Sequence, residues 1–337
     1  MRSDVALNIM TDKATQAPEL RELEFIQHLR RQNPGPSFTL PTRSTSTDLA
    51  ERHLCIVTEM ALRNLLSLAE QSFAEYIIPE HGTNTSVRDV LSALDYVHNV
   101  CNIIHTGPFV LHSRVLSNVC VDVKITNVMM TASHEEMPKE GLGALIPAQL
   151  HTFPASTDND TPVTVTKSIQ IVPDLNDPEV WLSFSFKLTR LWYKTDKHFT
   201  QEVCPVGIRP PEVALRAGWG KPVDIEHRLH ACLSGSLCFP FGVILLFLPA
   251  YQLQALGEFP ASLRNRSRIS KAWFNDDGSL RRKDVFPKKS FEALMEEQSG
   301  GALTLSSDCL HFMRRMLTLE TDERASIEEL LRHQWLN

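Results

Sequence analysis

An acid, an amine and an amide stand close together in the stretch "DVKITN", as Asp122, Lys124 and Asn127. The preceding "SVRDVLSALDYVHNVCNII" has the apolar spacing of an amphipathic helix with Ser86 as its expected N-cap, and the following "VMM" is apolar. Phosphoryl transfer requires such a set: a carboxylate that orients the attacking hydroxyl, a cation near the phosphate and an amide oxygen for magnesium. A polar turn before a buried strand explains the same residues, so the motif alone decides neither fold nor function.

Fifteen residues, 107–121, separate this motif from the "IIHT" that ends the helical stretch. A flexible insertion costs only about 0.6 kcal/mol per doubling of loop length. If His105 and Asp122 belong to one tight turn of a catalytic site, the position of the insertion favours a translated intron instead, because catalytic geometry tolerates only about 0.5 Å of error. If Gly107 is encoded GGT and Val121 GTA, a GT…AG segment is removed in phase and the aspartate codon is restored. Genomic codons and transcripts test this interpretation.

The composition predicts a soluble globular protein with a substantial core, since 42% of its 337 residues are hydrophobic. The formal net charge of -6 disfavours direct nucleic-acid binding and favours basic protein partners. Seven cysteines without a CxxC pair predict reduced thiols in a cytoplasmic or nuclear protein. We expect neither a signal peptide nor a membrane span, because the longest apolar run, residues 239–250, is shorter than the roughly 20 residues that a bilayer requires.

Hydrophobic periodicity predicts an alternation of strands, helices and loops along the chain. We expect little regular structure after Met130, where the sequence is polar and rich in proline up to about residue 179. In the final helix, Ile327, Leu330 and Leu331 share one face. The remaining expected elements are strands over residues 5–10, 53–60 and 181–189, helices over 17–31 and 62–71, and a loop over 33–48.

Three further motifs follow "DVKITN" along the chain. In order, they are "CPVGIRPPEV", "GWGKPVDI" and "DERASIEELLRHQWL". With these segments in order, the chain resembles a eukaryotic protein kinase over nearly its whole length. It is most similar to the SR-protein kinase branch in its fungal form, because of "HT" before "DVK", of "DKHFT" and of the long spacer after the motif. The resemblance implies protein substrates, including Arg/Ser-rich proteins, and no direct contact with nucleic acid or membrane.

The fold implied by the resemblance is α+β and two-lobed, with an incomplete small β lobe and a mainly helical large lobe. Residues 1–60 would form the partial small lobe, comprising its third strand, the C helix and the hinge strands. Residues 61–337 would form the large lobe, with inserts at about 107–121 and 131–180 and a disrupted segment at 226–250. Glycine, proline and histidine in that last segment argue against a long central helix.

The resemblance also assigns roles to individual residues. It makes Asp122 the catalytic base, Lys124 the phosphate contact and Asn127 a magnesium ligand. Glu212 would form an ion pair with Arg324 below the substrate-binding loop, and Asp224 would brace the catalytic loop. In isolation, each of these last three is better explained as a solvated surface charge, and it is the order of the motifs that favours the assigned roles.

Several positions depart from the pattern of this family, and all of them concern ATP and magnesium. Asn8 replaces the lysine that would contact the nucleotide and pair with Glu22, and Arg190 stands where a magnesium-binding aspartate is expected. Glu59 and Met60 would enter the hinge beside the adenine ring, after Thr58 as gatekeeper. We expect the glycine-rich loop and two strands to be missing, because only "MRSD" precedes residue 5.

Three hypotheses follow. The chain is a serine/threonine kinase that uses ATP and Mg²⁺; or it is a catalytically inactive pseudokinase that acts as a binding module; or it is the mis-spliced translation of a kinase gene, without a function of its own. The sequence does not predict its oligomeric state.

Overall fold

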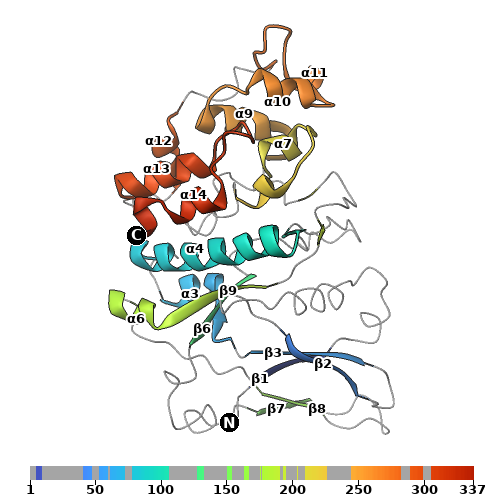
Figure 1. Cartoon of the computed structure of the whole chain (residues 1–337), viewed down its shortest axis with the longest axis vertical. Coiled ribbons are helices and arrows are strands. Elements are labelled where there is room, and N and C mark those ends of the chain that lie inside the picture. Colours follow the sequence, from blue (N-terminus) through green and yellow to red (C-terminus); the bar gives the residue numbers. More distant parts are fainter. Residues whose placement is uncertain are drawn as a thin grey trace.

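The computed structural model places helices mainly in one half of the molecule and a small antiparallel sheet in the other, with helix α4 (Glu80–Asp95) between them (Figure 1). None of the described helices has the length and apolar character needed to cross a membrane. The structure describes residues 5–9, 41–47, 53–59, 61–72, 78–105, 127–132, 150–153, 163–166, 175, 177–189, 193–194, 203, 209–225, 244–281, 289–298 and 305–337.

The small sheet contains β1 (Val5–Ile9), β2 (Pro41–Thr47) and β3 (His53–Glu59), with β3 in the centre. Two of these strands were predicted, but the loop expected over residues 33–48 is wrong where β2 forms. Threonines in "PTRSTST" favour extended backbone. Pro41 is tolerated because β2 lies at the edge of the described sheet, where a missing N–H costs no ladder bond. The expected helix over residues 17–31 lies outside the described residues.

Helix α4 begins earlier than the sequence indicated, because its N-cap is Pro79, seven residues before Ser86, and it continues into a π-helical turn at Tyr96–Val100. Ser86 is therefore not an N-cap. Its hydroxyl instead donates to the carbonyl of Thr83 at 2.8 Å within the helix. The N-terminal turn approaches a neighbouring indole so closely that a Cβ at Gly82 would lie 2.5 Å from Trp181, which requires glycine there.

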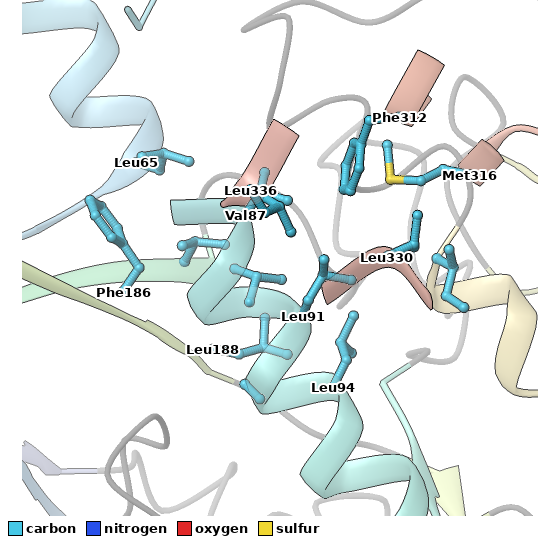
Figure 2. Packing of buried hydrophobic residues seen from close by; sticks show 14 of the residues in the cluster. Leu65, Val87, Leu91, Leu94, Phe186, Leu188, Phe312, Met316, Leu330 and Leu336 are labelled. Carbon is cyan, nitrogen blue, oxygen red and sulfur yellow. The ribbon is translucent and has the colours of Figure 1, made fainter. Parts of the chain in front are cut away.

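The main hydrophobic core forms around α4, from which Val87, Leu91 and Leu94 extend towards neighbouring elements (Figure 2). Fully burying one such side chain stabilises the fold by about 1.5–3 kcal/mol. Ile327 and Leu330 are buried in this core and Leu331 packs against it, as their spacing predicts. The partners are Leu65 of α3 (Leu65–Ser72), Phe186 and Leu188 of β9 (Phe184–Leu188), Phe312 and Met316 of α13 (Ser307–Met316), Leu330 of α14 (Ile327–Leu331), and Leu336.

The structure also contains a second three-stranded sheet and two separate strand pairs. In the second three-stranded sheet, β6 (Val128–Ala132) is central, between β9 and β4 (Arg63–Asn64). The expectation of little regular structure over residues 131–179 is wrong for β7 (Leu150–Phe153) and β8 (Val163–Thr166), whose β-branched residues pair antiparallel. Trp181 belongs to α6 (Pro178–Leu182), not to a strand, because Asp177 caps a helix there.

A helix does form within the segment expected to be disrupted. Helix α9 (Ile244–Leu256) contains Pro249, and Leu248 and Ala250 on either side of it are buried, so packing compensates for the backbone hydrogen bond that proline removes. Residues 226–243 lie outside the described part. The other elements are β5 (Ile103–Ile104), β10 (Tyr193–Lys194), α7 (Pro211–Ala214), a 3₁₀ turn (Lys221–Asp224), α10 (Ala261–Arg266), α11 (Ser270–Trp273), α12 (Phe291–Gln298) and a second 3₁₀ turn (Gln334–Leu336).

Candidate functional site

The fully buried carboxylate of Asp224 joins the residues that follow helix α4 to the 3₁₀ turn Lys221–Asp224. The Oδ2 atom of Asp224 accepts the backbone N–H of His105 at 2.6 Å and lies 2.9 Å from Nε2 of His98. Asp224 is 0% exposed, and a buried charge without donors would be costly. Charge-assisted hydrogen bonds of this kind hold position more firmly than neutral ones. Asp224 therefore fixes the backbone at the start of the stretch that leads to "DVKITN".

Thr189, at the end of strand β9, contacts both sides of that stretch. Nε2 of His105 lies 2.9 Å from the carbonyl oxygen of Thr189. The backbone N–H and the hydroxyl of Thr189 donate to the carbonyl of Asn127 at 2.9 and 3.0 Å. Residues 105 and 127, which are far apart in sequence, are thus held against one residue. The two residues that flank positions 106–126 therefore contact the same residue, Thr189.

Glu212 and Arg324 form a bidentate ion pair, with N–O distances of 2.9 and 3.0 Å. Their side chains are 1% and 0% exposed. Nη1 of Arg324 also donates to the carbonyl of Pro222 at 3.0 Å, and its Nε donates to the carbonyl of Thr318 at 3.1 Å. Because Pro222 belongs to the 3₁₀ turn that carries Asp224, this ion pair also supports the position of the buried carboxylate.

The structure thus brings together the supporting residues Asp224, Glu212 and Arg324, and it buries Asn127. Asn8 lies on β1 opposite Ile56 of β3, and Glu59 lies opposite Val5 on the same pair of strands. Asp122, Lys124, Glu22, Met60 and Arg190 lie outside the described residues.

The sequence analysis did not predict two residues that form hydrogen bonds in the candidate site, His98 and Thr189. His98 continues the buried face of the helical stretch, four residues after Leu94, and a histidine on such a face was a detectable signal. Thr189 carries no such signal, because its contribution comes largely from backbone atoms.

Nearby, burial raises the pKa of the Cys101 thiol, which keeps it protonated at neutral pH. Across the part of the chain that is described, no cluster of three or more His, Cys, Asp or Glu side chains could hold a metal ion.

Curated proteins similar to this chain are serine/threonine kinases. The kinase SKY1 of Saccharomyces cerevisiae is 25% identical over 231 residues, which are 62% of this chain and 29% of that protein. The kinase SRPK of Physarum polycephalum is 24% identical over 85% of this chain and 67% of its own length. SRSF protein kinase 3 of Homo sapiens is 27% identical over 42% of this chain and 26% of its own length.

The structure itself is similar to a crystallised kinase domain, with a TM-score of 0.62 and 16% sequence identity over 99% of this chain and 87% of the other. The chain is a protein-kinase-like protein similar to SR-protein kinases. Its two-lobed α+β fold is that of a kinase domain. No family model matches the chain. The matched part of the chain spans less than a third of the length of the yeast relative.

Removing residues 107–121 is expected to leave the fold intact and to raise the free energy of unfolding by about 1 kcal/mol. The connection between His105 and Asn127 would shorten from 21 residues (106–126) to 6 (106 and 122–126), close to two doublings of loop length. Six residues still span up to about 20 Å, enough to join ends that contact the same threonine. Urea denaturation of both forms measures the change. A cooperative transition lost on deletion would contradict this prediction.

Proposed function

We propose that this chain is a serine/threonine kinase-type domain that transfers phosphate from ATP to protein hydroxyls, with a transfer rate far below that of an intact kinase. The arrangement of His105, Asn127 and Thr189, braced by Asp224, carries the proposal, because it provides a fixed frame on both sides of "DVKITN". Within that frame, Asp122 would orient the substrate hydroxyl and accept its proton, and Lys124 would contact the phosphate.

ATP and Mg²⁺ are the cofactors that this assignment requires, and the residues present fit them only in part. Asn127 and Glu22 are of suitable chemistry, and Glu59 and Met60 would enter the hinge beside adenine. Asn8 lacks the charge of a lysine, and the guanidinium of Arg190 repels a divalent cation. Bound magnesium would neutralise the charge of the phosphates. Because these two positions do not fit, we expect weak nucleotide binding.

The domain boundaries and partners are part of the same proposal. Residues 1–60 would form the partial small lobe and residues 61–337 the large lobe, with inserts at about 107–121 and 131–180. The expected partners are Arg/Ser-rich proteins, supported by the similarity to SRSF protein kinase 3 and by the net charge of -6. A cytoplasmic or nuclear location accords with these partners.

Asn8 and Arg190 favour a second candidate, a pseudokinase that binds a protein partner without transfer. A titration with MgATP followed by thermal unfolding, together with a phosphotransfer assay on an Arg/Ser peptide, separates the hypotheses. The kinase-type proposal predicts a small nucleotide-dependent rise in Tm and slow transfer that D122N abolishes. Peptide binding without either signal would establish the pseudokinase. A chain without a cooperative transition would support a mis-spliced translation and contradict both.

A further inference from the structure

Arg63 is a charged residue on the apolar face of a sheet. It lies on β4 directly opposite Met130 of β6, and Met130 lies directly opposite Phe186 of β9. Directly opposed residues of antiparallel strands point to the same face. Met130 and Phe186 are 0% exposed and belong to the main core, and only 6% of Arg63 is exposed. The guanidinium therefore enters the same buried layer as two apolar side chains.

None of the three guanidinium nitrogens of Arg63 has a hydrogen-bond partner among the residues that the structure describes. Burial lowers the pKa of Arg63, but arginine titrates so far above neutrality that the side chain remains charged. Leaving a buried charge uncompensated is among the most destabilising arrangements in a protein. A guanidinium offers five N–H donors in a planar fork, which fits the two oxygens of a carboxylate or a phosphate.

The surroundings of Arg63 also favour an anion. Helix α3 begins at Leu65, immediately after β4, and its start is capped by Asn64, whose Oδ1 accepts the N–H of Ser67 at 2.8 Å. The first turn of α3 contains no acidic residue, so the partial positive charge of the helix N-terminus is not offset locally. In Figure 1, α3 lies beside β6 and β9, the strands that complete the sheet of Arg63.

We propose that Arg63 is the centre of an oxyanion-binding site, which takes a phosphate group through two N–H donors of its guanidinium. This site is independent of the proposed transfer chemistry, because none of the expected catalytic residues takes part in it. It lies four residues beyond Glu59, at the exit of the expected hinge. The phosphate is either free or part of a nucleotide, and both sources share the chemistry that the fork recognises.

Thermal unfolding in sodium phosphate, compared with sodium chloride of equal ionic strength, tests the proposal. The wild-type Tm should rise by about 5 °C at a phosphate concentration 100 times Kd. R63M should lose this rise, and in chloride it should melt at or above the wild-type Tm, because it removes an unpaired charge. R268M, which alters an exposed arginine, should respond as wild type.

R63K retains the charge without the fork, so it should bind phosphate at least about tenfold more weakly. ATP without magnesium, titrated in parallel into wild type and R63M, identifies the source. If the part of the response that R63M loses has a lower Kd for ATP than for phosphate, the source is a nucleotide; if its Kd is equal or higher, the source is free phosphate. The proposal is overturned if wild type shows no phosphate-specific rise, if R63M shows the same rise, or if R63M is destabilised equally in both salts. Phosphotransfer is not measured, so failure here leaves the kinase-type proposal untouched.

Discussion

Replacing Arg324 with methionine is expected to lower the free energy of unfolding by about 3–5 kcal/mol. The substitution keeps much of the side-chain volume but leaves the carboxylate of Glu212, which is 1% exposed, without its two guanidinium bonds. It also frees the carbonyls of Thr318 and Pro222. Urea denaturation followed by tryptophan fluorescence measures the loss.

A double-mutant cycle separates the ion pair from the burial of a single charge. E212Q alone should be costly, whereas E212Q/R324M should cost less than the sum of the two, because no buried charge remains. R332M is the matched control, since Arg332 pairs with Glu328 and the two side chains are 74% and 68% exposed. Its expected cost is below about 0.5 kcal/mol. A loss in R324M no larger than in R332M would contradict the buried pair as a structural brace.

The apolar pattern of the sequence predicted three of the described elements. Strand β1 follows from alternation, β3 from a short apolar run, and the buried face of α14 from helical spacing. The boundary of α4 could not be predicted, because Pro79 starts the helix without a side-chain cap and Ser86 looks like a better start. Strand β2 was missed since its residues are polar, and only its pairing with β3 reveals it.

The candidate site was predictable where the sequence order of charged residues carries information. Glu212 and Arg324 are 112 positions apart, and only the resemblance to a family indicated that they meet. Composition or spacing alone could not, because a buried pair and two surface charges have the same sequence. The role of Thr189 was not predictable at all, since a backbone N–H and carbonyl are present in almost every residue. The unpaired Arg63 likewise becomes visible only through its strand register.

Restoring the two degenerate positions is expected to increase phosphoryl transfer by a factor of about 10⁴ or more. The substitutions are made in a chain without residues 107–121. N8K would supply a cation that pairs with Glu22 and contacts the nucleotide. R190D would replace a guanidinium that repels Mg²⁺ with a carboxylate that can bind it. Each restored electrostatic contact contributes about 10²–10³ to the rate. Transfer of labelled phosphate from ATP to an Arg/Ser peptide measures the gain, and MgATP should now raise Tm.

The control for this repair is D122N in the same background, which should abolish transfer while keeping the MgATP-dependent rise in Tm. The two readouts would depend on different residues, because the proposed nucleotide site includes residues 8 and 190 whereas Asp122 is the proposed proton acceptor. If the repaired chain binds MgATP without any transfer, the frame around Thr189 does not hold "DVKITN" in a productive position. If it neither binds nor transfers, the alignment of Asn8 and Arg190 with the ATP site is wrong.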